Sequence, residues 1–410
     1  MTLLSTRRLT SLLGLLLFAT FAFTQNQETT ALDFQPPENP LEIIVAQTTE
    51  AIKIDGELNE LVWKDAEVIK DFFRREPRQG GAIKFKTEVR FLYDDKYLYI
   101  GAICYDSLGA KGVRIQDLRR DFDWGENDIF GIALDPQNLK QYAQVFQTTP
   151  YGNQRDLQNF NGNVFDTGWN TLWKVRTKRN NNGYSAEFAI PFKSLRYNKS
   201  SNSDSLSWGA TLVRYARRDV EVSTFPPIPQ SFTPYRMTYA AKLKGIKAPP
   251  PASNIRIEPY TLYQYDNVNN ASGSIQDSRF KLGGDIKWAL NSESVLDLTF
   301  NTDFAQADVD RAVNNLERFN IFFPERRQFF LENSGIWAGG LQQSIRPFFS
   351  RRIGLQGNFN ATPAPIQFGS RYTKRTEKEA IAALLVRQGA TSNSQASHFG
   401  VARYLSLIHI

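Results

Sequence analysis

The chain has 410 residues, a net charge of +7, a pI near 9.3 and a mean hydropathy of −0.41. Its length predicts two or three structural units. An aromatic content of 13%, with 30 phenylalanines, favours a β-rich architecture over a helical bundle. The positive charge is dispersed and forms no Lys/Arg run, which argues against a nucleic-acid partner.

The scarcity of cysteine and histidine excludes several chemistries. Cys104 is the single cysteine, so an intrachain disulfide and a zinc–thiolate cluster are excluded. Its apolar surroundings, YLYIGAICYD, predict a buried and unreactive thiol. The two histidines, His398 and His409, stand near the end of the sequence. Histidine-based catalytic triads and histidine-rich metal sites are therefore excluded from nearly the whole chain.

Residues 1–24 have the pattern of a secretory signal peptide. Arg7 and Arg8 precede the apolar run LTSLLGLLLFATFAF, and we expect cleavage near Thr24–Gln25. Residues 25–45 are predicted to be an extended lead-in. No later apolar run is long enough for a transmembrane helix, so membrane contact of the mature protein would require a barrel.

Short strand patterns separated by Gly, Asn and Asp run through residues 46–247. In TEVRFLYDDKYLYIGAICYD, a turn at Asp94–Asp95 separates two strands. LNELVWKDA predicts a short helix or turn that places Leu58, Leu61 and Trp63 inward, with Trp63 in the core. Many short strands over about 200 residues indicate a β-sandwich.

The stretch from Arg119 to Trp173 contains three tryptophans among many acidic and amide side chains. Flat indole faces suit the C–H face of a sugar ring, and planar amides and carboxylates suit its hydroxyls. This pattern predicts an oligosaccharide- or polysaccharide-binding site. The alternative is that the tryptophans fill the sandwich core while the acidic residues occupy solvated loops.

Five segments carry a resemblance: IDGELNELVWKDA, TEVRFLYDDKYLYIGAICYD, NDIFGIALDP, GYSAEFAIPFKSLRY and SWGATLVRYARR. In this order they resemble a family 9 carbohydrate-binding module over about residues 50–247. The resemblance implies a β-sandwich, often with structural calcium, that binds the ends of sugar chains between two tryptophans. It implies that Trp124 is one aromatic wall and that Trp169 or Trp173 is the other. Sugar contacts or cation ligands are implied at Glu126, Asp128, Arg155 and Asp156, whereas the Asn-rich segment LQNFNGNVFDTG departs from the family pattern.

Two further possibilities concern the carboxylates. Calcium needs six to eight oxygens, which Asp, Asn and backbone carbonyls of these loops could supply. A glycoside hydrolase would need two carboxyls facing each other across a cleft, for which Glu126 and Asp156 are candidates. The sequence contains no recognisable catalytic motif.

The sequence pattern changes after the predicted linker APPPASN, residues 248–254. Residues 255–410 contain long alternating segments with aromatic residues near their ends, which is typical of an outer-membrane β-barrel. About six strands are legible, fewer than the roughly eight of the smallest membrane barrels, so we expect an incomplete barrel and a truncated chain. An apolar segment between these strands, with Arg326, Arg327, Arg351 and Arg352, could plug or line a lumen; the alternative is a plain interstrand loop with a short helix.

The back half also carries a resemblance. NTDFAQADVDRAVNNLERFNIFFPERRQFFLENSGIW and FFSRRIG resemble domain-of-unknown-function family 5916. That resemblance implies a Gram-negative secreted protein in which an outer-membrane barrel follows a family 9-like module.

Three functional hypotheses follow. The first is an exported carbohydrate-binding protein at the outer membrane or cell surface of a Gram-negative bacterium. The second is a secreted glycoside hydrolase or a related carbohydrate-active enzyme. The third is a structural or transport barrel with a non-binding cap.

Overall fold

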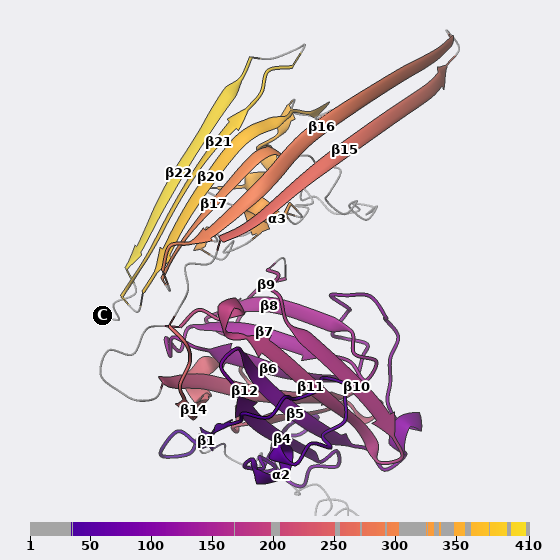
Figure 1. The fold of residues 1–410 in the computed structure, drawn as a ribbon, viewed down its shortest axis with the longest axis vertical. Coiled ribbons are helices and arrows are strands. Elements are labelled where there is room, and N and C mark those ends of the chain that lie inside the picture. The colour runs from indigo at the N-terminus through magenta and orange to yellow at the C-terminus, as the bar shows by residue number, and fades with distance from the viewer. Residues whose placement is uncertain are drawn as a thin grey trace, which may run out of the picture.

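The computed structural model describes most of the chain (Figure 1). The described residues are 34, 36–167, 169–197, 206–250, 255–270, 273–291, 293–302, 325, 327–331, 336–337, 348–356, 362–376, 378–391 and 395–406. The predicted signal peptide, residues 251–254 of the predicted linker and much of the family 5916 motif lie outside them.

The described chain is almost entirely β-structure, as predicted. Its two α-helices have four residues each: α2 (Val62–Asp65) and α3 (Gln328–Leu331). Short 3-10 turns are η1 (Gly109–Lys111), η2 (Phe192–Ser194), η3 (Arg217–Asp219), η4 (Met237–Tyr239) and η7 (Ser350–Arg352). None of the helices in the described ranges has the length and apolar character needed to cross a membrane.

The front half contains two sheets. The nine-stranded sheet runs β1-β14-β12-β6-β7-β8-β9, and β13 joins β3 to β12. Its strands are β1 (Glu42–Ile44), β3 (Phe73–Glu76), β6 (Ile129–Asp135), β7 (Tyr142–Thr148), β8 (Gln154–Phe160), β9 (Val164–Asp166), β12 (Leu206–Ala216), β13 (Glu221–Phe225) and β14 (Ala241–Ile246). The five-stranded sheet runs β10-β11-β5-β4-β2. Its strands are β2 (Ala46–Gln47), β4 (Thr87–Tyr93), β5 (Tyr97–Tyr105), β10 (Lys174–Asn180) and β11 (Gly183–Pro191).

These two sheets form a sandwich with a shared apolar core (Figure 1). Ile132 and Leu212 of the larger sheet and Ile100 and Phe188 of the smaller one belong to the same buried cluster. A second apolar cluster covers the other face of the larger sheet and contains Ile129 and Tyr235 among others. Because both faces of β6 are covered, all seven of its residues are buried.

Most local predictions for the sandwich are confirmed. The strands β4 and β5 pair antiparallel across the turn at Asp94 and Asp95. Cys104 is buried, and burial raises the pKa of its thiol. Trp63 is a core residue at 1% exposure, but the inward placement of Leu61 is wrong because its side chain is 66% exposed.

The back half forms a six-stranded antiparallel sheet in the order β15-β16-β17-β20-β21-β22, which matches the six strands expected (Figure 1). The strands are β15 (Ile255–Asn270), β16 (Gly273–Ala289), β17 (Ser294–Thr302), β20 (Ile366–Arg375), β21 (Glu379–Gln388) and β22 (Ser397–Ser406). A separate two-stranded ladder joins β18 (Leu355–Gln356) to β19 (Thr362–Pro363). In the described part of the chain β15 and β22 are the edges of the larger sheet.

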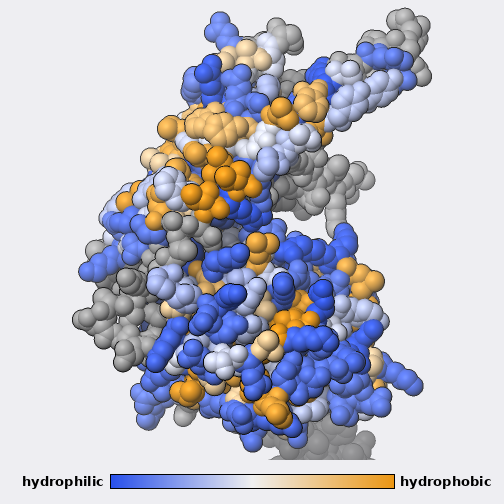
Figure 2. Space-filling view, viewed as in Figure 1, coloured by the Kyte–Doolittle hydropathy of each residue, from blue (hydrophilic) through white to orange (hydrophobic). Residues whose placement is uncertain are grey.

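The two faces of the six-stranded sheet differ in chemistry. One face packs against Phe329 of α3 and holds the buried ion pair between Arg371 and Asp297, whose closest N–O distance is 2.7 Å. Figure 2 shows apolar side chains gathered over the opposite face. That face exposes large side chains from most of its strands: Ile255, Ile257, Tyr263, Tyr265, Phe280, Leu282, Trp288, Phe300, Phe368, Leu385 and Tyr404.

Candidate carbohydrate site

Trp124 lies on the loop that connects η1 to β6, and half of its surface is exposed. Its ring packs against Tyr215 with a centroid separation of 6.1 Å. The guanidinium of Arg217 lies 5.2 Å from the Trp124 ring centroid and 4.9 Å from that of Tyr215. Arg217 Nη2 also donates a 2.7 Å hydrogen bond to the Trp124 carbonyl. The indole is therefore held from one side while the rest of it faces solvent.

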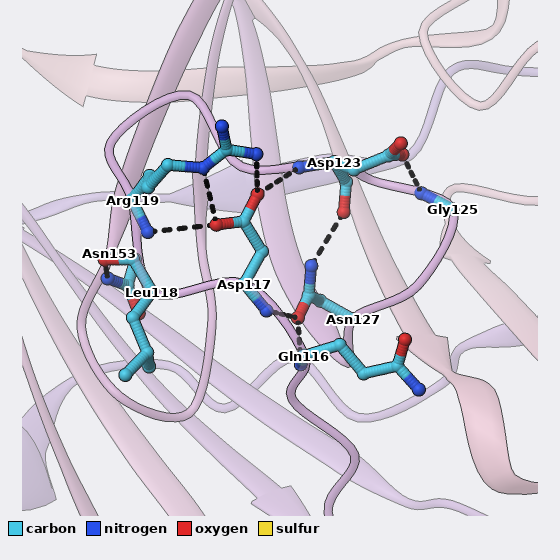
Figure 3. A network of polar contacts seen from close by, with 8 residues as sticks. All are labelled: Gln116, Asp117, Leu118, Arg119, Asp123, Gly125, Asn127 and Asn153. Atoms are coloured by element: carbon cyan, nitrogen blue, oxygen red, sulfur yellow. Dashed lines mark hydrogen bonds and ion pairs between the residues drawn. The ribbon is translucent and has the colours of Figure 1, made fainter.

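The buried side chain of Asn127 organises the Trp124 loop (Figure 3). Its Oδ1 accepts hydrogen bonds from the backbone N–H groups of Gln116 (2.8 Å) and Asp117 (3.2 Å). Its Nδ2 donates to the carbonyl of Asp123 at 2.7 Å. The Asp123 carboxylate in turn accepts from the N–H of Gly125 at 2.8 Å, one residue beyond Trp124. One amide side chain thus joins both ends of the segment that carries the indole.

Asp117 forms a second anchor in the same loop (Figure 3). Its carboxylate accepts 3.0 Å hydrogen bonds from Nε and Nη2 of Arg119, and a 3.3 Å hydrogen bond from the Asp123 N–H. The bonds from Arg119 hold the pKa of Asp117 well below its usual range. The side chain of Asn153 donates to the Leu118 carbonyl and ties the loop to the start of β8. A loop held in this way loses little conformational entropy when a ligand binds.

The two acidic residues that follow Trp124 differ in their surroundings. Glu126 is half exposed and pairs with Arg114 at 3.1 Å, a surface ion pair of small energetic value. Asp128 is buried, accepts a 2.7 Å hydrogen bond from the Arg217 N–H and lies 3.6 Å from Arg214. The Asp128 carboxylate thus anchors the segment that holds Trp124 and is not open to a sugar, while its role as a cation ligand stays a prediction.

Asp156 is also an internal anchor. Its carboxylate is buried and accepts hydrogen bonds from Arg120 Nη2 (2.6 Å) and the Thr171 N–H (2.7 Å). Arg120 donates as well to Gln154 (2.8 Å) and Asn170 (2.7 Å). Burial raises the pKa of Asp156 to about 6, although the charge of Arg120 acts in the opposite direction. The prediction of direct ligand contact is wrong for Asp156, which joins three segments through the partly exposed Arg120.

Arg155 lies on the opposite face of β8 from Asp156, because successive strand residues alternate. It is half-buried and donates a 3.2 Å hydrogen bond to Gln147 Oε1. Gln147 in turn donates to the hydroxyl of Tyr235. Arg155, Glu126 and Trp124 are thus the predicted contacts that solvent reaches, and their contact with a ligand stays a prediction.

The structure corrects the expected second tryptophan wall. Trp169 and Trp173 are 3% and 6% exposed, and both belong to the core between the sheets. Trp173 is stacked on Phe188, with ring centroids 5.6 Å apart and an interplanar angle of 7°, and packs edge-on against Phe146 at 5.3 Å. Trp169 contacts Phe146 at 6.0 Å. Neither indole offers an open face, so the core alternative is right for these two residues.

Four aromatic side chains on the outer face of the larger sheet form what we call the aromatic row: Trp124, Tyr215, Tyr235 and Phe165. Tyr215 and Tyr235 are buried in the middle, and their hydroxyls are hydrogen-bonded to each other. Phe165 packs edge-on against Tyr235 at 6.2 Å and is 43% exposed. Sequence reasoning missed Phe165, Tyr215, Tyr235 and Arg217. Their separation along the chain leaves no local pattern.

The described residues contain no group of three or more Asp, Glu, His or Cys side chains arranged to hold a metal ion. Asp117, Asp128 and Asp156, which lie in the region considered for calcium, are occupied by arginines and backbone N–H groups. These three carboxylates are thus engaged within the protein, and a structural calcium held by Asn and backbone oxygens of the same loops stays a prediction.

Two grooves lie away from this region. One, with about 460 Å³ of empty space including its open mouth, lies between the sandwich and the six-stranded sheet and includes Phe160 and Arg375. The other, of about 420 Å³, lies on the polar face of that sheet beside Asp285 and Arg371. Neither is lined by any of the predicted contact residues. Trp124 instead presents an open platform.

Fold and site together define a two-part β-protein whose sandwich presents an exposed indole on a fixed loop. Residues 54–212 match the family described as carbohydrate family 9 binding domain-like, and residues 251–382 match the domain of unknown function DUF5916. The chain therefore carries a family 9-like domain followed by a DUF5916 domain, as the sequence resemblances predicted. None of the curated proteins matches the chain.

Three solved structures resemble about half of the chain. Two are complexes of a family 9 carbohydrate-binding module from Caldicellulosiruptor kristjanssonii. The cellotriose complex is 18% identical, with 50% of this chain and 92% of that chain covered and a TM-score of 0.34. The glucose complex is 15% identical, with coverages of 50% and 94% and a TM-score of 0.35. The third is a putative carbohydrate-binding protein from Bacteroides uniformis, 9% identical, with coverages of 50% and 99% and a TM-score of 0.39.

Proposed function

We propose that the sandwich binds carbohydrate by stacking a sugar ring on the exposed face of Trp124. The observation that carries this proposal is a half-exposed indole on a loop held by the buried Asn127. The ring is held on one side by Tyr215 and Arg217, and its solvent-facing part has a ready use as a platform for the C–H face of a sugar. The match of residues 54–212 to the family 9-like domain supports the same function.

The groups around Trp124 suit a neutral, hydroxyl-rich ligand. Charged side chains of both signs lie near the ring, as in the ion pair of Arg114 and Glu126. Such groups can donate to and accept from hydroxyls without imposing a strong net field. Ligand recognition would then combine one stacking contact with several hydrogen bonds and no bond cleavage.

Calorimetry on the whole chain tests this function. The ligands are a panel of mono- and oligosaccharides that includes glucose and cellotriose. We expect measurable binding that Trp124→Ala weakens by about 1–3 kcal/mol, the range known for base–aromatic stacking. The matched control is Tyr151→Ala, which removes an aromatic side chain of similar exposure (52%) outside the aromatic row. Unchanged binding in Trp124→Ala would exclude stacking on this ring.

We further propose that the protein is exported and attached to an outer membrane through the six-stranded sheet. One face of this sheet exposes Tyr263, Phe280, Leu282, Leu385 and Tyr404 on neighbouring strands, and contiguous exposed apolar patches usually mark an interaction surface. Alternation of apolar and polar faces along long antiparallel strands is what a lipid-facing sheet needs.

Cell fractionation tests this attachment. In a Gram-negative host we expect the chain in the outer-membrane fraction and resistant to carbonate extraction. Recovery in the soluble periplasmic fraction would contradict the attachment, and retention in the cytoplasm would contradict the export.

A further inference from the structure

The aromatic row has two exposed ends. Trp124 is 50% exposed at one end and Phe165 is 43% exposed at the other. The rings between them, Tyr215 and Tyr235, are 5% and 4% exposed. The row therefore offers two separate apolar contacts to a ligand, joined by a covered aromatic floor.

Strand order sets the separation of the two strands beside these contacts, because Trp124 packs on Tyr215 of β12. Tyr215 lies on β12, and Phe165 lies on β9, which is four strand steps away across β6, β7 and β8. At the usual interstrand spacing this corresponds to about 19 Å between the two strands. A single pyranose ring cannot stack on both ends of the row, whereas a chain of several sugar units can reach from one to the other.

The floor of the row is fixed by close packing. A Cβ placed on Gly131 would come within 3.0 Å of Val213 and 3.1 Å of Gln147, and 3.6 Å from the Tyr235 hydroxyl. Glycine at this position therefore leaves room for the side chains of Val213 and Gln147 on this face of the sheet. Gln147 donates to the Tyr235 hydroxyl and accepts from Arg155, so a partly exposed cation lies beside the row.

Hydrogen bonds also hold the Phe165 end of the row against the segment that carries Tyr235. The turn between β8 and β9 accepts hydrogen bonds at the carbonyls of Asn161 and Gly162, from Arg236 and Thr233 respectively. These two donors flank Tyr235 in sequence. Phe165 pairs with Asn159 in the β8–β9 ladder and so shares the sheet face of Arg155. Its position relative to Tyr235 is thus set before any ligand arrives.

We propose that Phe165 is the second stacking residue of the site, and that the ligand is an oligosaccharide or a polysaccharide segment lying along the aromatic row. This inference rests on the carbohydrate-binding function proposed above. It replaces the two-tryptophan clamp with two spaced contacts, and it places Arg155 where it can donate to hydroxyls in the middle of the chain. A monosaccharide would use the Trp124 end alone.

Chain-length dependence of binding tests the proposal. The probes are the mono-, tri- and hexasaccharides of β-1,4-glucan, β-1,4-xylan and α-1,4-glucan, measured by calorimetry on the whole chain. For the wild type we expect affinity to rise with length in at least one series. Phe165→Ala should weaken hexasaccharide binding by about 5- to 150-fold and leave monosaccharide binding unchanged. Trp124→Ala should weaken binding at every length.

Phe165→Leu separates ligand stacking from folding, because it keeps an apolar contact with Tyr235 and removes the flat ring. It should show the hexasaccharide defect with the melting temperature of the wild type, and Tyr151→Ala should show neither change. Wild-type hexasaccharide affinity in both Phe165 variants, together with a defect in Trp124→Ala, would overturn the role of Phe165 and leave the proposed function standing. Absence of wild-type binding in all three series would overturn both.

Discussion

Replacing Trp173 by alanine should damage the fold and spare the sugar-binding surface. The indole is 6% exposed and packs against the rings of Phe188 and Phe146. Removal of a buried tryptophan typically costs about 3–5 kcal/mol, and the loss of aromatic pairs is part of that cost. For a unit of 150–250 residues, about 2–4 °C of melting temperature accompany each kcal/mol. We therefore expect Trp173→Ala to lower the melting temperature by about 6–20 °C.

Trp124→Ala provides the contrast. Half of this indole is already in water, and its contact with Arg217 is worth about 0.5–1 kcal/mol at an exposed site. We expect a change in unfolding free energy of about 1 kcal/mol or less. Scanning calorimetry and denaturant titration of both variants measure the two effects, and calorimetry with the best-binding saccharide measures affinity. A Trp173→Ala protein with wild-type melting temperature and lost saccharide binding would refute the placement of Trp173 in the core.

Three other predictions concern the loop, the buried carboxylate and the sheet. Asn127→Ala leaves several backbone groups of the Trp124 loop without their hydrogen-bond partner. It should therefore lower the unfolding free energy by about 1–3 kcal/mol and weaken saccharide binding. Equal saccharide affinity in variant and wild type would show that the loop needs no such anchor. Because the pKa of Asp156 is raised from 3.8 to about 6, the native state holds its proton more tightly than the unfolded state. The stabilisation from this tighter proton binding is therefore largest at low pH, and up to about 3 kcal/mol of it is lost as pH rises from about 4 to 6. The unfolding free energy of Asp156→Asn should consequently fall less over this pH window than that of the wild type. Identical pH profiles would contradict the raised pKa. Leu385→Arg places a charge on the exposed apolar face of the back sheet. If that face meets lipid near the bilayer centre, the substitution should destabilise the membrane-bound protein by about 2–4 kcal/mol and reduce its recovery in the membrane fraction. Leu61→Arg, at a similarly exposed leucine of the sandwich, should leave that recovery unchanged.

Sequence reasoning was most successful where local periodicity decides structure. Alternation and turn residues predicted the antiparallel pair β4 and β5 and the number of strands in the back sheet. Local pattern also predicted two core residues: Cys104 from its apolar run, and Trp63 from its place in a short helix or turn.

The sequence could not decide which tryptophan faces solvent. Trp124, Trp169 and Trp173 all lie outside strands, where no alternation reports the direction of a side chain. Trp124 is exposed because Asn127 and Arg217 hold its loop, and Trp173 is buried because Phe188 and Phe146 receive it. These partners come from other parts of the chain, so the distinction exists only in the folded protein.

The aromatic row was hidden for a similar reason. Phe165 belongs to a three-residue strand within an Asn-rich segment, which is too short to show a period of two. Its neighbour Tyr235 comes from the segment after β13, and the pairing depends on tertiary packing. Exposed aromatic residues in loops are therefore candidates that a sequence can suggest, whereas their grouping requires the structure.

Ligand protection of individual indoles is the most direct test of saccharide stacking on Trp124. The whole chain is oxidised with N-bromosuccinimide with and without a saturating oligosaccharide, and each tryptophan is followed by peptide mass spectrometry. Trp288 on the back sheet is 40% exposed and serves as an internal control. We predict that Trp124 is oxidised readily in the free protein and protected by the saccharide, while the oxidation of Trp288 is unchanged. Equal oxidation of Trp124 in the free and saccharide-bound protein would contradict stacking on this residue.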